Sequence, residues 1–317
     1  MGAAAFLALS AAGIGAVCAA PAPLLWRVTG CTPGPSYLFG ILHSADPRVT
    51  ALAPPVRRAI DDSRRLVMEV LPTPATLAVL GAAGFDAAGP GLPARLGPAL
   101  FAATARRIEP YGVPKDLLRR MRPWAVVATL SLPPPRAGLY QEFVVYLYAR
   151  ARGKPAAALL DPEAQVARFE RLPGARQVAL VRAVVDRHGA AVRALAEQRR
   201  AYLDGDLAAL ARLRRDYPTF RHHPAAAAAF RALLRRTARR EVPRLLAQLR
   251  AGSRFAAITA INLPGPDGVL AGLRAGGCTL RRTGVPDAYA GSASTASKRQ
   301  ATVAPARNAT TRASPNG

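Results

Sequence analysis

Hydrophobic runs near the start of the chain predict two strands, a helix and a third strand. Residues 24–29 and 36–42 have the composition of strands and are joined by a Gly/Pro-rich turn. Residues 54–63 have helical spacing with Pro near the start, and residues 65–70 form a compact apolar run typical of a buried strand. This order predicts a βαβ unit with a right-handed crossover and a parallel sheet.

The middle of the chain has a helical period. From about residue 75 to 237, apolar positions recur at helical spacing and are interrupted by prolines, with one short strand predicted at residues 156–160. Residues 241–250 predict a helix that starts or is interrupted near Pro243, because proline disrupts a helix interior.

The last periodic segments predict a strand, a helix and a further strand of the same sheet. Residues 254–263 predict another buried strand, residues 268–276 a helix closed by Gly-Gly, and residues 278–281 a last short strand. These patterns predict an α/β fold with a mostly parallel central sheet flanked by helices and a large helical middle region.

An apolar segment opens the chain. Residues 3–17 are apolar or small, a length typical of a secretory signal rather than a membrane span, and small residues follow that suit cleavage after Ala19 or Ala20. No Lys or Arg precedes this run, so an uncleaved anchor and a lipoprotein lipidated at Cys18 are alternatives. We expect residues 1–20 to be a signal peptide or N-terminal anchor. The protein is then exported, either periplasmic or secreted, or tethered to the membrane.

The composition changes again at the other end. Residues 284–317 contain Ser, Thr, Ala and isolated cations with almost no large apolar groups, which predicts a disordered tail after a domain spanning residues 21–283. Removal of the signal would leave Cys31 and Cys278. An even number of cysteines in an exported protein permits a disulfide, although two separate buried thiols fit the sequence equally well.

The charge balance is strongly basic and comes from arginine. Lys and Arg outnumber Asp and Glu by 44 to 19, a formal charge of +25, and only three of the cations are lysines. Such a charge suits nucleic acid, anionic polysaccharide or an anionic membrane surface as a partner. The arginines are spread along the chain without any nucleic-acid-binding motif, and export argues against nucleic acid. We therefore interpret most of the excess as general surface charge.

Two side chains are candidates for chemistry at the end of the sheet. Gly40-Ile41-Leu42-His43 places a histidine at the carboxyl end of a predicted strand, where α/β proteins bind ligands. Glu69 lies near the end of the next strand, and a carboxylate there is costly unless it is paired, hydrogen-bonded or metal-bound. If the two strands are neighbours, His43 and Glu69 share one edge and form part of a metal site that activates water. A structural histidine and an ion-paired glutamate are the alternatives.

A third ligand is not evident from spacing. The remaining histidines are His188 and the pair His222-His223, and adjacent histidines do not share a face of a helix or strand. Asp161 and Glu163 follow the short strand predicted at residues 156–160 and are placed to reach the same rim.

Several motifs resemble TraB/GumN family proteins, which are related to the Tiki metalloproteases and have an erythromycin-esterase-like fold. The resemblance spans about residues 24–282, with the motifs in the expected order. The motifs are Leu25-Trp26-Arg27-Val28, Tyr37-Leu38-Phe39-Gly40-Ile41-Leu42-His43, Met68-Glu69-Val70, Arg122-Pro123-Trp124, Gly153-Lys154-Pro155, Glu163-Ala164-Gln165, Gly205-Asp206 and Leu263-Pro264-Gly265-Pro266-Asp267-Gly268.

The resemblance implies a divalent-metal site built from two Gly-x-x-His motifs and a glutamate. The first motif is intact as Gly40 and His43, and the glutamate corresponds to Glu69. The implied cofactor is Mn, Co or Zn, with His43 and Glu69 as metal ligands or catalytic acid and base, and with Gly40 contributing to the cofactor site.

This chain departs from the family pattern at the rest of that site. Thr259 and Asn262 stand where the second motif has Gly and His, and Leu160 stands at a second acidic position. Arg236-Thr237 is the nearest match to an Arg-Asn pair on the late helix. An amide oxygen is a poorer transition-metal ligand than imidazole, so Asn262 would bind a harder cation weakly, or the site binds no metal.

Two functions remain open from the sequence. The first is an exported metal-dependent hydrolase or peptidase with impaired or lost catalysis. The alternative is a non-catalytic binding protein of the envelope, whose partner is a peptide, another envelope component, an anionic polysaccharide or the membrane surface.

Overall fold

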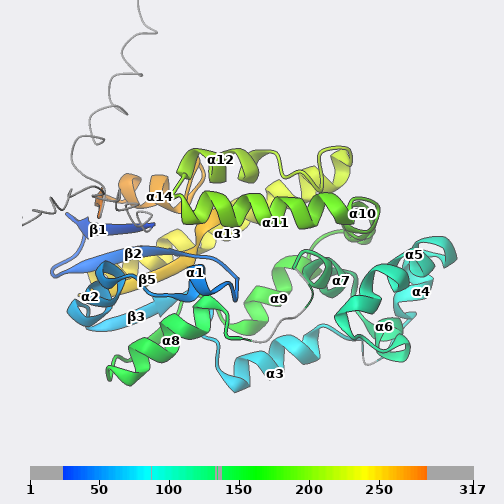
Figure 1. Ribbon diagram of the computed structural model, residues 1–317, viewed down its shortest axis with the longest axis horizontal. Coiled ribbons are helices and arrows are strands. Elements are labelled where there is room, and N and C mark those ends of the chain that lie inside the picture. The colour runs from blue at the N-terminus through cyan, green and yellow to red at the C-terminus, as the bar shows by residue number, and fades with distance from the viewer. Residues whose placement is uncertain (1–23, 87, 133, 135–137, 284–317) are drawn as a thin grey trace, which may run out of the picture. The chain divides into compact units, whose positions relative to one another are not determined.

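The computed structural model describes residues 24–86, 88–132, 134 and 138–283 (Figure 1). The predicted signal peptide or anchor and the predicted disordered tail lie outside these residues, so both stay predictions. Within the described ranges, no helix is long and apolar enough to cross a membrane.

A six-stranded sheet in the described residues has the strand order β4-β3-β5-β2-β1-β6. Its strands are β1 (Leu25–Thr29), β2 (Ser36–Ile41), β3 (Arg65–Met68), β4 (Ala156–Ala158), β5 (Arg254–Thr259) and β6 (Thr279–Arg282). Strands β4, β3, β5 and β2 run parallel, whereas β1 is antiparallel to both of its neighbours. The predicted α/β class and the mostly parallel sheet are confirmed.

Strand β5 lies between β2 and β3, so the strands that carry Gly40 and Glu69 are not neighbours. Gly40 pairs with Ile258, while Met68 on the other side pairs with Ala257. Because all three strands are parallel, their carboxyl ends still meet at one edge of the sheet. The central strand also ends earlier than predicted, because residues after Thr259 turn into a 3₁₀ helix, η2 (Ala260–Asn262).

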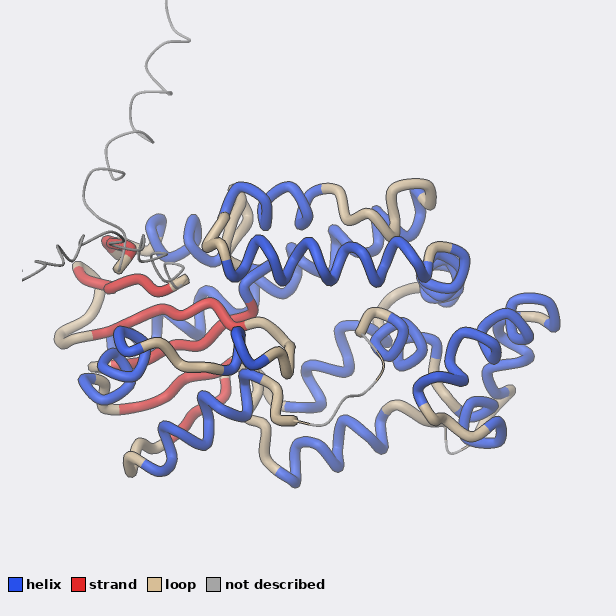
Figure 2. Tube along the Cα trace, in the orientation of Figure 1, coloured by secondary structure: helices blue, strands red, loops and turns tan. Residues whose placement is uncertain are grey.

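Helices cover both faces of the sheet and fill the region beyond its carboxyl edge (Figure 2). They are α1 (Pro47–Thr50), α2 (Pro54–Asp62), α3 (Pro74–Ala83), α4 (Gly91–Leu96), α5 (Pro98–Ile108), η1 (Glu109–Tyr111), α6 (Lys115–Arg120), α7 (Pro123–Leu130), α8 (Gln141–Ala151), α9 (Pro162–Glu170), α10 (Gly174–Asp186), α11 (His188–Leu203), α12 (Leu207–Arg215), α13 (Pro224–Arg250) and α14 (Val269–Ala275). The predicted helical middle region is confirmed.

Successive side chains of the strands pack alternately in two separate hydrophobic cores, one on each face of the sheet. Phe39 of β2 packs with Ile60 of α2 and Val145 of α8 on one face of the sheet. Leu38, next to Phe39, packs on the opposite face with a core that includes Leu245 of α13. This period of two is what a strand buried on both faces requires.

A third core lies among the helices of the middle region. It joins α4, α5, α6, α7 and α10 to the first half of α13. Helix α13 runs without a break through Pro243, so the predicted start or interruption there is wrong. Pro243 removes one helical hydrogen bond, but buried residues before and after it, such as Leu233 and Leu245, hold both halves of the helix in the core.

Cys31 and Cys278 form a disulfide, which settles the two alternatives that the sequence leaves open. Cys31 follows β1, and Cys278 lies between α14 and β6. Gly277, next to Cys278, has a φ of 89°, the left-handed conformation expected after the helix that Gly-Gly closes.

Candidate functional site

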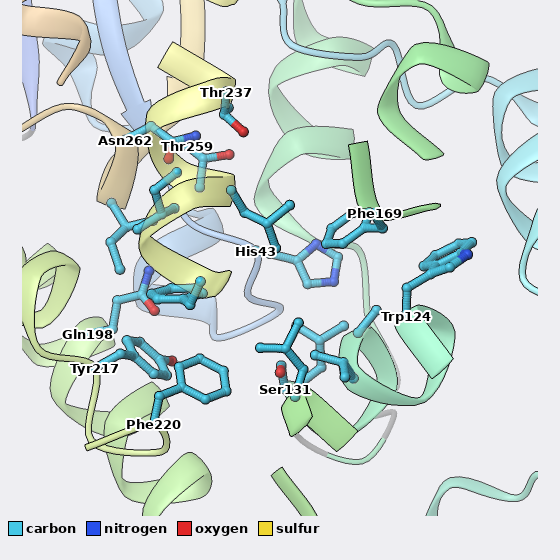
Figure 3. A pocket seen from close by; sticks show the side chains of 18 of the residues that line it. His43, Trp124, Ser131, Phe169, Gln198, Tyr217, Phe220, Thr237, Thr259 and Asn262 are labelled. Carbon is cyan, nitrogen blue, oxygen red and sulfur yellow. The ribbon is translucent and has the colours of Figure 1, made fainter. Parts of the chain in front are cut away.

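A cavity of about 310 Å³ lies at the carboxyl ends of β2, β3 and β5. Its rim at the sheet contains Leu42, His43, Glu69, Thr259 and Asn262, and the rest of its wall comes from helices α7, α9, α10, α11 and α13 and from the segment around Tyr217. In Figure 3 His43 lies among the lining residues, with Asn262 and Thr259 toward one end of the view and Ser131 toward the other. The edge predicted from the sequence is therefore the edge that carries the cavity.

Gly40 is needed because its neighbours leave no room for a side chain. A Cβ on Gly40 would lie 2.8 Å from Leu263 Cδ1 and 3.0 Å from Leu24 Cβ. Its backbone is not in the left-handed region, so close packing rather than φ explains the glycine. Gly40 therefore shapes the sheet edge and offers no ligand of its own.

A buried amide and a phenol hold the backbone between Gly40 and Leu42. The Leu42 N–H donates to Gln141 Oε1 at 2.8 Å, and the Tyr202 hydroxyl donates to the Gly40 carbonyl at 2.9 Å. Gln141 Nε2 also donates to the Tyr202 hydroxyl at 2.8 Å. Burial raises the pKa of Tyr202, so its hydroxyl keeps the proton that it donates.

His43 is engaged by two residues of the segment that begins α8. Its Nδ1 pairs with Glu142 Oε1, and its ring stacks on Tyr140 with centroids 4.0 Å apart and planes at 10°. The second Glu142 oxygen is buried and finds no hydrogen-bond partner among the described residues. The sequence offered no sign of Glu142, which lies 99 residues from His43 and belongs to no recognised motif.

Glu69 is held by Thr259 and Asn262, the two residues that the resemblance aligns with the second Gly-x-x-His motif. Its Oε2 accepts from both the N–H (3.2 Å) and the hydroxyl of Thr259, and its Oε1 accepts from Asn262 Nδ2 at 2.9 Å. Both carboxylate oxygens are thus occupied by donors. The alternative to a metal ligand was an ion-paired glutamate, whereas the donors found here are the neutral side chains of Thr259 and Asn262 and a backbone N–H.

Asn262 has its oxygen turned away from Glu69. Asn262 Oδ1 accepts from Arg214 Nη1 at 3.4 Å, while its Nδ2 faces the carboxylate. The carboxylate only accepts and the guanidinium only donates, so the reverse amide orientation would lose both bonds. Arg214 is 6% exposed and also donates to the Ile261 carbonyl at 3.2 Å. Burial lowers the pKa of Arg214, and Asp267 opposes this shift.

These donors do not fit a divalent metal. The amide atom directed at Glu69 is an N–H donor, which cannot ligate a cation, and the Glu69 oxygens already accept three hydrogen bonds. In the part of the chain that the structure describes, no group of three or more His, Cys, Asp or Glu is placed to hold a metal ion. His43 and Glu69 line the same cavity, but each belongs to a different hydrogen-bonded group.

The other histidines and acids considered from the sequence lie away from this cavity. His188 begins α11 and contacts Tyr111 edge-on, and burial lowers its pKa. His222 and His223 precede α13. Asp161 is the N-cap of α9, and Glu163 is in its first turn. None of these residues lines the cavity.

Leu160, Arg236 and Thr237 do come together. All three line a groove of about 400 Å³, and Thr237 lines the cavity as well. The segments that the resemblance placed near the site are therefore close to it, although Leu160 and Arg236 lie in the adjoining groove.

The deeper wall of the cavity is apolar and aromatic. Trp124 stacks on Phe169 with centroids 5.6 Å apart and planes at 15°, and Tyr217 contacts both Phe220 and Phe230. Burial raises the pKa of Tyr217 to about 12, so its hydroxyl is neutral at physiological pH. Among these five residues, only Trp124 belongs to a recognised motif. The rest are ordinary apolar positions in sequence, so their role was missed.

Comparison with known proteins identifies a family. A sequence profile described as the TraB/PrgY/gumN family matches residues 24–282. No curated protein and no solved structure matches the chain significantly.

Proposed function

Since the chain belongs to the TraB/PrgY/gumN family, we propose that it is a member that has lost metal-dependent hydrolysis and acts as an exported binding protein. Its ligand, a component of the envelope, occupies the cavity at the carboxyl edge of the sheet. A cavity of about 310 Å³ lies within the range of about 300–1,000 Å³ typical of small-molecule sites. Apolar walls with a few convergent polar groups are also typical of such sites.

The state of Glu69 carries this proposal. The carboxylate is hydrogen-bonded by Thr259 and Asn262, the residues that stand at the second Gly and His positions. Thr259 and Asn262 therefore do more than remove a metal ligand. They supply the Glu69 carboxylate with hydrogen-bond donors where a cation would otherwise bind. A structural role for Glu69 follows, with Asn262 linking it to the buried Arg214.

Export is part of the proposal. The disulfide between Cys31 and Cys278 supports it, because disulfides persist mainly in oxidising compartments outside the cytoplasm. The apolar residues 3–17 supply a matching signal. Fractionation of expressing cells and N-terminal sequencing of the mature protein test this step. A cytoplasmic protein that starts at Met1 would contradict it.

Metal-independent acid–base catalysis is the second candidate, and the His43–Glu142 pair favours it. A carboxylate on Nδ1 fixes the tautomer of an imidazole and orients its other nitrogen. Glu142→Gln would then lower any hydrolytic activity measured in chelator. A binding role predicts no such activity in the first place.

Metal content tests the main proposal. The full chain is purified and exposed in turn to Mn, Co, Zn and Fe, dialysed, and analysed by elemental mass spectrometry. We expect far less than one metal ion per chain. The double variant Thr259→Gly/Asn262→His, which restores the second motif and removes both side-chain donors from Glu69, should retain more metal than the wild type.

Two further variants make the result decisive. His43→Ala in the double-variant background should remove the gained metal, since imidazole is then a ligand. His43→Ala in the wild-type background should change nothing. Near-stoichiometric metal in the wild type that disappears with His43→Ala would overturn the proposal and leave an active metallohydrolase.

A further inference from the structure

An arginine-rich groove adjoins the cavity. The groove of about 400 Å³ is lined by Arg171, Arg236, Arg239 and Arg240, over a floor that includes Leu160. None of the described residues that line it is acidic. The ion pairs found between described side chains involve other arginines and not these four.

The groove gathers four arginines, whereas two other arginines that are partly or fully buried have carboxylate partners. Arg122, which lines another pocket, contacts both Asp86 and Glu170. Arg214 is matched by Asp267. Guanidinium groups that converge on one groove without a carboxylate form a site for a carboxylate or phosphate from outside the chain.

Two segments run along both the groove and the cavity. On α13, Leu233 and Thr237 line the cavity, while Arg236 and Arg240 line the groove. Thr237 and Arg240 are three residues apart and so lie within one helical turn, about 5.4 Å. At the end of α9, Arg171 lines the groove directly before Leu172, which lines the cavity. Apolar and cationic surfaces therefore adjoin, and Thr237 belongs to both.

We propose that the ligand is an anionic amphiphile, an inference that rests on the binding role proposed above. Its apolar part occupies the cavity between Trp124 and Phe230, and its carboxylate or phosphate is held in the groove by Arg236, Arg239 and Arg240. An alkyl carboxylate and an alkyl phosphate share this chemistry. A hydrophilic polyanion does not, because it has nothing to place against the aromatic wall.

Titration calorimetry with three probes of equal chain length tests the inference. The full chain is titrated in EDTA with decanoate, decyl phosphate and the neutral decanol. At least one of the two anions should bind about tenfold more tightly than decanol, because charge-assisted hydrogen bonds to arginine are added to the same apolar contact. Comparison of decanoate with decyl phosphate identifies the head group. Trp124, in the cavity wall, gives an independent fluorescence signal.

Matched variants locate the two halves of the site. Arg236→Gln/Arg239→Gln/Arg240→Gln should remove the preference for the anion and leave decanol binding unchanged. Arg231→Gln/Arg235→Gln/Arg244→Gln removes the same charge from exposed positions of the same helix outside the groove and should change anion affinity less than about twofold. Ala128→Trp, which places an indole in the cavity, should weaken all three probes, with circular dichroism as the check on folding.

The outcomes separate this inference from the proposed function. Three results would overturn the inference. Decanol and both anions could bind with equal affinity, the two triple variants could have equal effects on anion affinity, or none of the probes could bind. These results leave the metal analysis untouched. Anion binding that appears only after metal replaces EDTA would overturn both, because the arginines would then not be the anion site.

Discussion

Gly40 lies where the sheet, the cavity rim and the segment after η2 converge. A Cβ at this position would lie only 2.8 Å from Leu263 Cδ1, and both Leu263 and Leu24 are buried. We therefore expect Gly40→Ala to lower the free energy of unfolding by about 1–3 kcal/mol, the usual cost of overpacking a core. Urea denaturation followed by circular dichroism measures the change.

Gly81 supplies the matched control. It is exposed in α3, has a negative φ, and nothing lies within 4 Å of its Cβ position. Gly81→Ala should raise the stability by about 0.5–1 kcal/mol, because alanine loses less backbone entropy in a helix. Equal effects of the two substitutions would show that backbone entropy, and not packing against Leu263, explains Gly40.

Individual residues also show how far the site could be predicted from the sequence. Gly40, His43 and Glu69 were recognisable because motif and strand pattern coincide at one edge, and all lie there. The partners of the two polar side chains were not recognisable. Glu142 contacts His43 from a helix 99 residues later in the chain. The orientation of the Asn262 amide is set by the hydrogen bond that its oxygen accepts from Arg214. Such pairings depend on tertiary packing, which hydrophobic period does not encode.

The elements at the antiparallel side of the sheet are joined by the disulfide. Cys31 and Cys278 are 247 residues apart in sequence, so the bond restricts nearly the whole domain when it unfolds. Cys31→Ser/Cys278→Ser should lower the free energy of unfolding by about 2–5 kcal/mol. A reducing agent should bring the wild type to the same denaturation midpoint and leave the double variant unaffected. A wild type that does not respond to reduction while unfolding would contradict this role.

Helices of the middle region are tied together by Asp86. Its carboxylate accepts from Arg95 of α4 at 3.1 Å and from Arg122, next to α7, at 2.9 Å, and Arg122 continues to Glu170 at the end of α9. Asp86 is 9% exposed. Asp86→Asn should therefore cost about 1–2 kcal/mol, after allowance for the partial exposure of the arginines.

The exposed pair between Asp216 and Arg221 is the comparison for Asp86. Both side chains are more than half exposed, so solvent and salt screen the pair. Asp216→Asn should change stability by less than about 0.5 kcal/mol. A result for Asp86→Asn as small as this would show that the helices are held by their apolar core alone.

At the scale of elements, the strands were easier to predict than their order. Each run of buried residues appeared as a strand because both faces of the sheet are covered. The insertion of β5 between β2 and β3 was not predictable, since a late segment with small residues such as Ala256 and Ala257 fits between any two parallel strands. The prediction at Pro243 was wrong for a related reason. Local propensity predicts a break in the helix there, but packing against distant residues keeps α13 continuous.

For the molecule as a whole, the arginine excess has two components. Most of the 44 Lys and Arg residues are dispersed, as the sequence pattern indicates. Arg171 and Arg236 are 65 positions apart in the numbering, yet both line the groove beside the cavity. Net charge alone therefore describes the protein poorly. For the proposed ligand, the relevant charge is the part that gathers along this groove.

The pH dependence of global stability provides a last test of the cavity wall. Burial raises the pKa of Tyr217 to about 12, whereas an unfolded tyrosine titrates near pH 10. Between these values the unfolded chain has lost a proton that the folded chain keeps, so stability is fully present below about pH 10 and falls as the pH rises toward 12. Tyr217→Phe removes this loss. Urea unfolding at several pH values from 8 to 11.5 should show a decline about 1–2 kcal/mol smaller in the variant, with the remaining slope coming from groups such as Tyr202. Identical slopes would mean that water reaches the Tyr217 hydroxyl, and hence that the cavity wall is more polar than its residues indicate.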